Sequence, residues 1–592
     1  MALVAAFVLE ANRVKPIAVL DLETDPFKKF RSPQPFLAGW FNGERTRTFW
    51  GEKCIEQCWQ SMRKELRGHY IYAHNGGKFD FRYFLPYLAK ESAKVIPIKG
   101  RMARFVLEDG TEFRDSFCLL PVPLKATGEK QEIDYRKFEK DRREKHREEI
   151  IAYWKQDLRA LFDKVQEFVS VYGFGMTMAG RTFEQLKTRF DVHPPKANEF
   201  HDRQFRRFYY GGRVQFFRLG QCPGVWRVFD INSAYPHAMM KEHAFGLEFE
   251  DTEPKLPRDT ATLERCFVRF TGESKGGLPW RQADKSLSFA PHAGEFFVTG
   301  WELVAAREAG AVRVDEVLEC LKPTECRDFS RFVEFFYKQK REAVKGSSEE
   351  LFAKLFLNSA YGRFALNPRE FKDTKMTPYR EEPEENEEYR TLVRKLVEKK
   401  HPEIKGEAFR LACAETWEAF EQKWTLTNDF EDIGVSVWER PVEVRSNSFF
   451  NVATAASITG CVRAHLFRSL RAVREPVYCD TDSIICRDPG TLKIGRELGE
   501  WKEEAESKPG GLWIAGRKLY ALEKKGGGWK LASKGVRLSP REIQTVANGE
   551  AVKSTLHAPT FSLYTTRSAR GSKADFITRT IVRDDKRKRR GA

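Results

Sequence analysis

Three aspartates in the second half of the chain have the residue type and the spacing to bind a divalent cation. Asp230 lies in the motif VFDINSAYP, and Asp480 and Asp482 lie in YCDTDS, with apolar residues on both sides. Flanking apolar strands would place Asp-Thr-Asp at the tip of a β-hairpin, where negative charges crowd together. That crowding is costly unless a cation neutralises it. The alternative is an Asx-type turn without a ligand.

A second set of acids lies in the first third of the chain and could bind two metal ions. It consists of Asp21 and Glu23 in DLE, Asp80 in HNGGKFD, and Tyr153 and Asp157 in YWKQD. The first two share a face on a strand, and the last two share a face on a helix. Four carboxylates on rigid elements suit two Mg²⁺ or Mn²⁺ ions, which could activate water against a phosphodiester. Each fragment alone is also common on a solvated strand end or helix face.

A cluster of cationic and polar side chains lies in sequence between Asp230 and the Asp480–Asp482 pair. The motif KLFLNSAYG places Lys354, Asn358 and Tyr361 on one face of an expected helix. Lys340 and Arg341 lie on an expected helix just before it. Such a cluster can bind a triphosphate, and a solvated basic face is the alternative.

Local sequence signals predict the elements that position these residues. The apolar run at 17–20 predicts a buried strand that ends in the first acids, and alternating strands and helices up to about residue 170 predict an α/β unit. Gly346 is expected to end the first of the two basic helices, and Ser347 with Glu350 forms a capping-box pattern that starts the second. The two helices should therefore form a hairpin.

The amino-acid composition limits the classes of protein to which the chain can belong. The chain has 592 residues, enough for about three to six domains, and 102 Lys and Arg against 85 Asp and Glu give a net charge of +17, which favours a nucleic-acid partner. A hydrophobic content of 41% excludes a wholly disordered chain, and the lack of a long apolar run excludes a membrane span. Eleven cysteines without a CxxC pair indicate neither a zinc site nor a disulfide framework. The first residues lack a basic leader, so we expect a cytoplasmic protein that is not secreted.

The motifs together resemble the family B DNA polymerases, and within them the protein-primed, phage-type group. The first acidic set resembles the family's 3′-5′ exonuclease motifs. DINSAYP, KLFLNSAYG and YCDTDS resemble, in this order, its first palm motif, its fingers motif and its second palm motif. The resemblance extends from about residue 17 to about residue 540. It implies an α/β multidomain fold, with an RNase H-like exonuclease domain followed by a right-hand polymerase of palm, fingers and thumb with insertions.

The resemblance also divides the chain into segments. They are an exonuclease domain at 1–195, a linker with a YxGG motif at 196–225, the first part of the palm at 226–255, an insertion resembling terminal-protein region 1 at 256–325, fingers at 326–368, an enlarged insertion resembling terminal-protein region 2 at 369–440, the second part of the palm at 441–490, a thumb at 491–580 and a basic tail at 581–592. The polar segment at 366–402, with its acidic run EEPEE, is expected to be an inserted surface element.

The roles that the resemblance implies fall into three groups. The catalytic group is Asp230, Asp480 and Asp482 for extension and Asp21, Glu23, Asp80, Tyr153, Asp157 and Lys137 for 3′-end removal. The expected ligands of two Mg²⁺ or Mn²⁺ ions per site are Asp230, Asp482 and the backbone of Ile231, and Asp21, Glu23, Asp80 and Asp157. The expected dNTP-binding group is Ser233, Tyr235, Lys340, Arg341, Lys354, Asn358 and Tyr361. The expected DNA-binding group, from YxGG, TxxxR, KxY and two exonuclease elements, is Asn75, Ser116, Tyr209, Gly211, Gly212, Thr459, Arg463, Lys518 and Tyr520.

The implied function is template-directed DNA synthesis with 3′-5′ proofreading, in the protein-primed replication of a linear viral or plasmid genome. The implied partners are template and primer DNA, dNTPs and a terminal protein, with the chain itself a monomer. Three departures from the family pattern qualify this expectation: an extra residue between His74 and Asp80, Phe117 in place of the usual Leu, and the enlarged second insertion. The alternatives are priming by nucleic acid or without a primer, and a non-catalytic DNA-binding relative.

Overall fold

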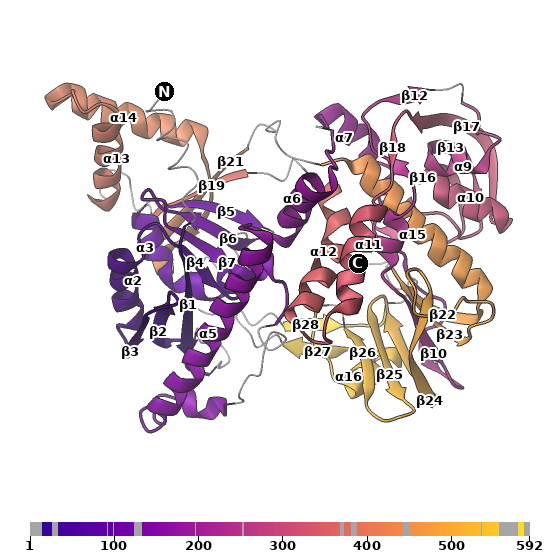
Figure 1. The fold of residues 1–592 in the computed structure, drawn as a ribbon, viewed down its shortest axis with the longest axis horizontal. Coiled ribbons are helices and arrows are strands. Elements are labelled where there is room, and N and C mark those ends of the chain that lie inside the picture. The colour runs from indigo at the N-terminus through magenta and orange to yellow at the C-terminus, as the bar shows by residue number, and fades with distance from the viewer. Residues whose placement is uncertain are drawn as a thin grey trace.

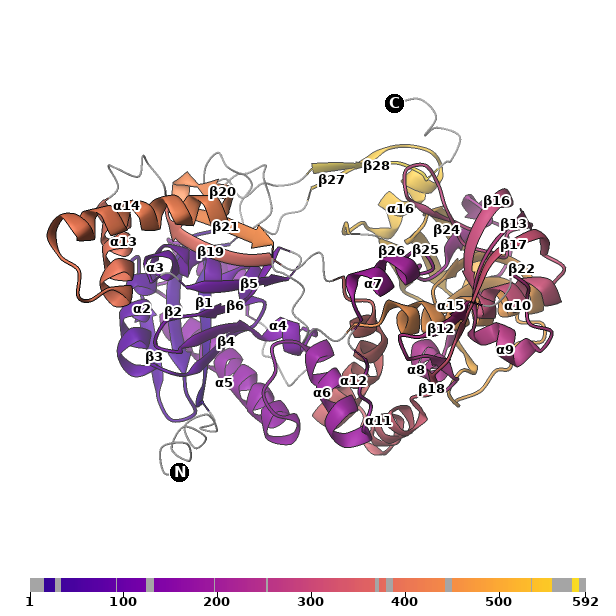
Figure 2. The same cartoon turned by 90° about the horizontal axis from the view of Figure 1, so that it is seen from above.

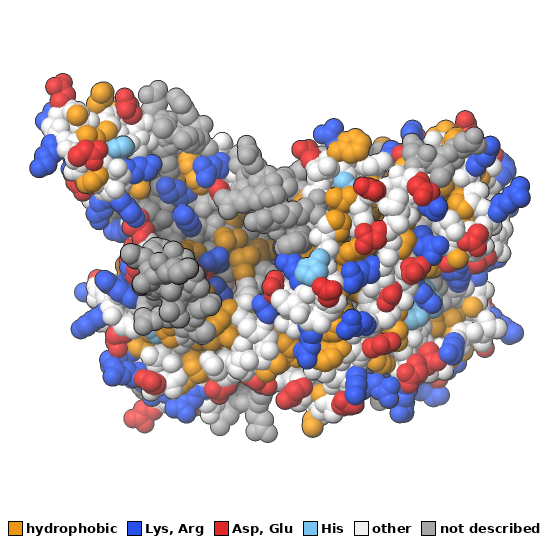
Figure 3. Space-filling view, turned by 45° about the horizontal axis from the view of Figure 1, so that its top comes forward, with side chains coloured by type: hydrophobic (Ala, Val, Ile, Leu, Met, Phe, Trp, Pro, Cys, Tyr) orange, Lys and Arg blue, Asp and Glu red, His pale blue; other side chains and the backbone are white. Residues whose placement is uncertain are grey.

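The computed structural model describes two lobes joined along one side (Figures 1 and 2). The described residues are 15–26, 33–91, 93–98, 100–123, 133–195, 197–251, 254–367, 372–379, 387–441, 450–533, 535–555 and 578–584. Within them, no helix is long and apolar enough to cross a membrane. Figure 3 shows Lys and Arg interspersed with Asp and Glu over the described surface of one face, so the net positive charge does not by itself mark a DNA path there.

The first lobe is built on a ten-stranded sheet. Its strand order is β20-β21-β19-β5-β6-β7-β4-β1-β2-β3. The bounds are β1 Ile17–Thr24, β2 Pro35–Phe41, β3 Thr46–Trp50, β4 Tyr70–Ala73, β5 Lys94–Ile98, β6 Arg101–Val106, β7 Glu112–Asp115, β19 Lys372–Pro378, β20 Thr425–Phe430 and β21 Val435–Pro441. β1, β4 and β7 are parallel, which confirms the α/β unit predicted at the N-terminus.

Helices cover both faces of this sheet. On one face lie α2 (Cys54–Glu65) and α3 (Leu85–Lys90), whose buried residues pack with Leu20 and Leu22 of β1. On the other lies α5 (Arg147–Tyr172), which packs with Val19 and, as Figure 1 shows, crosses the lobe diagonally. Gly39 on β2 allows that approach, because a Cβ there would lie 2.0 Å from a backbone oxygen and 2.7 Å from the indole ring of Trp154 on α5. The close contact brings α5 against the strand that carries the first acids.

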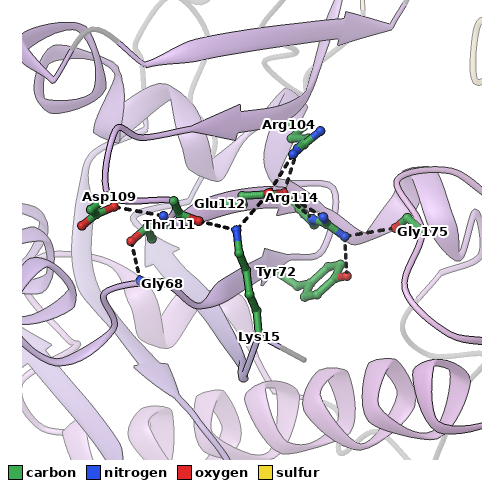
Figure 4. Close-up of polar contacts among 10 residues, drawn as sticks. Lys15, Gly68, Tyr72, Arg104, Asp109, Thr111, Glu112, Arg114 and Gly175 are labelled. Carbon is green, nitrogen blue, oxygen red and sulfur yellow. Dashed lines mark hydrogen bonds and ion pairs between the residues drawn. The ribbon is translucent and has the colours of Figure 1, made fainter. Parts of the chain in front are cut away.

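A buried carboxylate fixes the start of β7 in this lobe. Glu112 accepts hydrogen bonds from Arg104 and Arg114 at 2.7 Å each and forms an ion pair with Lys15 at 3.3 Å (Figure 4). Burial alone would raise the pKa of Glu112, but the hydrogen bonds and charges of these arginines lower it. Arg114 also lies over the Tyr70 ring, 3.6 Å from its centroid. The network therefore joins three segments of the chain at this edge of the lobe.

The second lobe contains an eight-stranded sheet. Its order is β26-β25-β24-β10-β23-β22-β8, with β9 paired to β24. The bounds are β8 Val214–Phe216, β9 Gly220–Cys222, β10 Arg227–Ile231, β22 Arg474–Asp480, β23 Ser483–Asp488, β24 Trp501–Gly516, β25 Leu519–Lys524 and β26 Trp529–Ser533. Helices α8 (Ala234–Met239) and α15 (Val452–Ala472) share one core with Phe229 and Ile484 of the sheet.

This sheet extends past one predicted boundary. The palm was expected to end at residue 490, yet β24 pairs with β10 from Arg227 to Ile231. The sheet that holds Asp230 therefore runs through the segment assigned to the thumb. The sequence did not show this because strand pairing between residues about 270 positions apart leaves no local pattern.

The insertion between the palm motifs is a small domain of its own. Strands β12 (Phe249–Asp251), β17 (Val312–Pro323), β13 (Phe267–Ser274) and β16 (His292–Thr299) form a four-stranded sheet in that order. Helices α9 (Thr260–Arg265) and α10 (Gly300–Glu308) pack beside it, and two short pairs are formed by β14 (Trp280–Arg281) with β15 (Leu287–Ser288) and by β11 (His243–Ala244) with β18 (Cys326–Arg327). Because β12 belongs to its sheet, this unit begins at 249 rather than at the predicted 256.

The second insertion is not wholly a surface element. Strand β19 pairs with β5 and β21, and Met376 is fully buried in the core of the first lobe. Among its described residues, the helices α13 (Glu387–Lys400) and α14 (Gly406–Lys423) project from the lobe (Figure 2). The expectation for 366–402 was wrong for β19, because its apolar residues add a strand to an existing sheet edge. The acidic run at 381–385 lies outside the described residues.

The expected helical hairpin connects the two lobes. Helices α11 (Ser330–Glu342) and α12 (Ser348–Phe364) pack on α5 and α6 (Met178–Phe190) through aromatic side chains. Phe168 of α5 lies 5.1 Å from Phe352 and 6.1 Å from Phe356, measured between ring centroids. Helix α7 (Glu199–Arg206) leads from the first lobe into the second. One helix, α5, thus contacts both the first acidic set and the basic hairpin.

The C-terminal end of the described chain is ordered beyond the predicted thumb boundary. Helix α16 (Pro540–Ala547) packs on β24, and β27 (Val552–Thr555) pairs with β28 (Thr578–Ile581). Asp584 donates its backbone N–H to the carbonyl of Ala515 at 2.8 Å. The segment assigned to the basic tail at 581–592 is described as far as Asp584, and residues 585–592 lie outside the described residues.

Candidate active sites

The three downstream aspartates converge at one edge of the second sheet. β22 and β23 form the predicted hairpin, with Asp480 opposite Ser483, and Ser483 also pairs with Asp230 on β10. The N–H of Ile231 donates to the carbonyl of Asp482 at 2.8 Å, which ties the hairpin tip to the strand of Asp230. Thr481 has a left-handed backbone (φ 58°), an uncommon conformation for a β-branched residue.

Burial and mutual repulsion act on these acids. Burial raises the pKa of Asp230 to about 7, with further contributions from the charges of Asp482 and Glu504. The pKa of Asp482 is raised by burial and then by the charge of Asp480. A bound cation would remove this repulsion. Within the part of the chain that the structure describes, no group of three or more His, Cys, Asp or Glu side chains is arranged to hold a metal ion.

Asp480 differs from its two neighbours because it has a cationic partner. Its carboxylate forms an ion pair with the ammonium group of Lys518 at 2.9 Å and accepts a hydrogen bond from Thr481 Oγ1 at 3.0 Å. Lys518 in turn donates its backbone N–H to the hydroxyl of Tyr478 at 2.9 Å. Tyr520 lies on the same side, and burial followed by the charge of Asp480 raises its pKa. Both residues of the KxY motif therefore border the aspartates.

The YxGG segment supports the hairpin tip from the other side. The carbonyl of Arg213 accepts a hydrogen bond from the N–H of Thr481 at 2.7 Å. A Cβ on Gly212 would lie 2.5 Å from Thr481 Oγ1, so only glycine fits against the tip in this arrangement. Gly211 is exposed, and a Cβ there would meet open space. Tyr209 is half-buried, with its carbonyl bound by the Arg281 side chain at 2.9 Å.

The structure does not support direct DNA contact by the TxxxR pair. Arg463 is 2% exposed, forms an ion pair with Glu302 of α10 at 2.7 Å, and donates to the carbonyls of Tyr210 and Gly211 at 2.6 and 3.0 Å. Thr459 is equally buried and donates to its own helix. Arg463 therefore joins the YxGG backbone to the first insertion, and the DNA-binding roles expected of both residues stay predictions.

Two tyrosines predicted to meet the nucleotide stack on each other. The rings of Tyr235 and Tyr361 lie 3.8 Å apart with an angle of 2° between their planes. Ser233, which precedes α8, has a left-handed backbone (φ 54°), so this turn is conformationally strained. Asn358 and Lys354 are exposed on the same helix as Tyr361, while Phe352 and Phe356 on the opposite face are buried. The predicted helical face is therefore present.

The basic hairpin differs from its prediction in two details. α11 ends at Glu342, because Ala343 has an extended backbone, and Gly346 lies in the turn instead of ending the helix. Ser347 caps α12 as predicted, but the Glu350 carboxylate accepts the N–H of Gly346 at 2.6 Å and not that of the cap residue.

Of the two alternative phosphate ligands on α11, only one faces Lys354. Burial lowers the pKa of Lys340, and the charge of Lys354 lowers it further, which places the two ammonium groups near each other. Arg341 is exposed and lies 3.7 Å from the carboxylate of Glu497. The predicted nucleotide contact by Arg341 is therefore not supported in this conformation.

The upstream acids also lie together. Asp80 is 4% exposed and accepts a hydrogen bond from the N–H of Leu22, the residue between Asp21 and Glu23 on β1. Burial raises the pKa of Asp80 to about 7, with a further contribution from the charge of Asp115. Because Leu22 packs into the core on one side of the sheet, the acids beside it face α5 on the other.

Helix α5 supplies the remaining two groups. The pKa of Tyr153 is raised by burial, by a hydrogen bond with Tyr135 and by the charges of Asp157 and Glu23, so these side chains meet in one place. The two phenol oxygens lie 3.4 Å apart. Glu23 and Tyr135, together with Phe79, line a cavity of about 340 Å³ beside β1. This cavity can receive a chain end next to the acids.

Three other predicted residues near this cavity have different outcomes. Asn75 is exposed with a left-handed backbone (φ 61°), so it remains available for contact. Ser116 is fully buried and donates to the carbonyl of Ala73 at 3.3 Å, and its contact with DNA stays a prediction. Lys137 pairs with Glu149 at the start of α5, and the structure does not bring its ammonium group to the acids.

Comparison with known proteins decides the family. The chain is 37% identical over 533 residues to the DNA-directed DNA polymerase of Enterobacteria phage PRD1, a match that covers 89% of this chain and 86% of the relative. The chain belongs to the type B DNA polymerases. The sequence profile described as DNA polymerase type B, organellar and viral, matches residues 125–409 of the polymerase. It is a DNA-directed DNA polymerase, which confirms the resemblance found in its motifs.

More distant similarity confirms the fold. The polymerase is 22% identical over 548 residues to a probable DNA polymerase of Agaricus bitorquis, covering 78% of this chain and 65% of that one. The structure of Phi29 DNA polymerase with primer-template DNA and incoming nucleotide substrates matches with a TM-score of 0.68 at 17% identity, covering 96% of this chain and 100% of that chain. The Phi29 polymerase bound to single-stranded DNA gives a TM-score of 0.65. An exonuclease unit followed by palm, fingers and thumb is therefore the architecture of this polymerase.

Several residues of these sites were not found from the sequence. Glu504 lies in a bulge of β24 beside Asp230, and Glu302 holds Arg463. Asp115 accepts the N–H of Gly77 at 3.2 Å and pairs with Arg101, so it supports the loop that leads to Asp80. Only Asp115 carried a local signal, its position directly before a helix.

Proposed function

We propose that this polymerase extends a primer at Asp230, Asp480 and Asp482 and removes 3′-terminal nucleotides at Asp21, Glu23, Asp80, Tyr153 and Asp157. The observation that carries the proposal is the pair of separate acidic sites, one with the buried Asp80 and one with the half-buried Asp230, each with a pKa raised to about 7. Isolated charges are seldom buried together without a function, because each burial costs free energy.

In the extension site, this chain's residues would hold each reactant in place. Asp230, Asp482 and the backbone of Ile231 would hold two divalent cations, Mg²⁺ or Mn²⁺, which supply the positive charge that favours an ionised primer hydroxyl and stabilises the leaving pyrophosphate. Lys518 and Tyr520 border the acids where a primer terminus would lie.

The nucleotide would lie on the opposite side of the extension site. Lys340 of α11 lies close enough to Lys354 of α12 for the charge of Lys354 to lower its pKa, and both would neutralise the triphosphate. The stacked rings of Tyr235 and Tyr361 offer a flat apolar surface for the base pair and sugar. Tyr235 would exclude a ribose 2′-hydroxyl by occupying its place.

In the trimming site, Asp21, Glu23, Asp80 and Asp157 would hold the cations, and the phenol of Tyr153 would donate a hydrogen bond to the attacked phosphate or its water. The cavity beside Glu23 is lined by Phe79 and Phe138, whose rings suit an unpaired terminal base. A frayed primer end could therefore be held there without its template partner.

Protein priming is the third part of the proposal. It is supported by the sequence similarity to a phage polymerase and by a cavity of about 960 Å³ beside Gly212 and Lys518. The first insertion contributes Leu287 and Phe289 to its wall, and the C-terminal segment contributes Ile581 and Arg583. A terminal protein that offers a side-chain hydroxyl would approach the palm acids through this space.

Two substitutions test the assignment of the two acidic sites. Asp482→Asn should abolish primer extension and leave trimming of single-stranded DNA intact, and Asp80→Asn should do the reverse. Both variants keep the side-chain shape, so melting temperature should change little. Loss of both activities from either substitution would contradict separate sites. Priming is tested by incubating the polymerase with labelled dATP and the terminal protein of its own genome; a labelled oligonucleotide primer extended without any labelled protein would favour nucleic-acid priming.

A further inference from the structure

A lysine outside every motif lies on the same sheet face as the catalytic aspartate. In the antiparallel register of β10 and β24, Lys502 is directly opposite Asp230. Paired residues of adjacent strands project from the same face of a sheet, with Cβ atoms about 5 Å apart. Lys502 is exposed, so its four-carbon side chain can extend above the acids toward solvent.

The segment just before Lys502 is bound to the fingers helix that carries Lys340. The Tyr337 hydroxyl on α11 donates to the carbonyl of Arg496 at 3.0 Å, and Arg341 lies 3.7 Å from Glu497. The carbonyl of Glu500 accepts the N–H of Asn232, close to Asp230, at 2.9 Å. This loop therefore spans the space between the palm acids and the fingers, and Lys502 follows it directly.

The electrostatics agree with this position. Burial lowers the pKa of Lys340, and the positive charges of Lys354 and Lys502 lower it further. Lys502 is therefore opposite Asp230 in the sheet and close enough to Lys340 for its charge to act there. A triphosphate that reaches from the palm acids to Lys354 must pass this point.

Lys340, Lys354 and Lys502 differ from neighbouring lysines in their ion pairing. Lys518 pairs with Asp480, Lys530 pairs with Glu504, and Lys493 pairs with Glu500. Among the described residues, the ammonium groups of Lys340, Lys354 and Lys502 have no carboxylate partner. Asp230 opposite Lys502 and Glu350 near Lys340 offset part of this charge, but three ammonium groups without an ion-pair partner still attract a polyanion.

We propose that Lys502 is a third ammonium group that binds the triphosphate of the incoming nucleotide, and the pyrophosphate that leaves, in addition to Lys340 and Lys354. This inference rests on the proposed nucleotide-binding role of those two lysines. Lys502 acts by charge and by hydrogen bonds to phosphate oxygens. It lies on the palm side of the site and the other two lysines lie on the fingers side, so the triphosphate is held from both sides.

The test compares Lys502→Ala with Lys508→Ala, a matched control on the same strand whose ammonium group pairs with Glu523. The KM for dNTP in single-nucleotide insertion and the KM for pyrophosphate in the reverse reaction should each rise about tenfold in Lys502→Ala, the size of one charge-assisted hydrogen bond. The kcat should change by less than about threefold. Lys502→Arg should restore most of the affinity, and trimming of single-stranded DNA should be unchanged in all three variants.

Other outcomes would overturn the proposal. An unchanged KM with a lower kcat, or with an alkaline shift of the pH profile, would mean that Lys502 acts only on the charge of Asp230. Loss of folding in both Lys502→Ala and Lys502→Gln, seen as a large fall in melting temperature, would mean a structural role. A Lys354→Ala variant measured in parallel distinguishes failure of the Lys502 proposal from failure of the proposed nucleotide site. If it raises the KM and Lys502→Ala does not, only the third ligand is lost; if neither does, the proposed nucleotide site fails.

Discussion

Gly212→Ala tests how closely the YxGG segment controls the geometry of the palm acids. The new Cβ would lie 2.5, 2.7 and 2.9 Å from three side-chain atoms of Thr481, all below the roughly 3.4 Å of ordinary contact. To relieve this, the tip between Asp480 and Asp482 must move by almost 1 Å. Overpacking of this kind costs about 1–3 kcal/mol, and a displacement of about 1 Å at reacting groups can lower a rate by about 100-fold.

The assay is the rate of single-nucleotide insertion on a primed template, with trimming of single-stranded DNA as the internal control. Insertion should fall between 10- and 100-fold, and trimming should stay the same because the upstream acids lie in the other lobe. A second substitution, Thr481→Gly, should recover much of the loss, since it removes the clashing atoms and suits the left-handed backbone at that position. Gly526→Ala, with open space around its Cβ, should be neutral. Normal insertion by Gly212→Ala would refute the reasoning.

Three further substitutions or conditions test other parts of the structure. Burial lowers the pKa of His243 to about 4 against about 6.5 in an unfolded chain, so the unfolded state gains a proton first and this residue should cost up to about 3 kcal/mol of stability as the pH drops from 6.5 toward 4. His201 and His465 act in the same direction and Asp80 and Asp230 in the opposite one, so the check is the difference between denaturation series of the native polymerase and His243→Gln; the same pH dependence in both would contradict it. Arg463→Met leaves the Glu302 carboxylate buried without its partner and should cost about 3–5 kcal/mol of stability; recovery in the Arg463→Met, Glu302→Gln double variant would show that the pair, and not DNA contact, is what was lost. Phe168→Ala removes a buried ring between α5 and the fingers and should cost about 3–5 kcal/mol, seen as a lower melting temperature; a loss below about 1 kcal/mol would mean that the two lobes are held together elsewhere.

Local patterns were sufficient for several elements of both sites. The hairpin around Asp480 and Asp482, the strand that carries Asp21 and Glu23, and the helical face that carries Lys354 were all predicted from spacing and apolar flanks. In each case the determining information lies within about ten residues. A strand alternates with a period of two and a helix with a period of 3.6, so neighbouring positions decide the face of each residue.

These local patterns could not predict whether a polar residue of a motif is buried. Ser116 and Arg463 have the residue types expected of a DNA contact, yet both are buried among protein groups. A sequence shows which hydrogen bonds a side chain can make, but not whether a carbonyl such as that of Tyr210 or a carboxylate such as that of Glu302 will be its partner.

Long-range strand pairing was also missed. Strand β19 pairs with β5, and β24 pairs with β10, although the paired segments lie far apart in the chain. The residues of one strand do not indicate which distant strand it will pair with. Lys502 was missed for the same reason, because its position opposite Asp230 exists only once the two strands are paired.

The central claim, that one chain extends and trims at two separate acidic sites, is tested most directly by release of free dNMP. A primed template is supplied with only the next correct dNTP, so that a nucleotide can be added, removed and added again. The account predicts continuous conversion of dNTP to dNMP by the native polymerase, extension without dNMP by Asp80→Asn, and primer shortening without dNTP consumption by Asp482→Asn. Continued dNMP release by Asp80→Asn, or loss of both reactions in one of these variants, would contradict it.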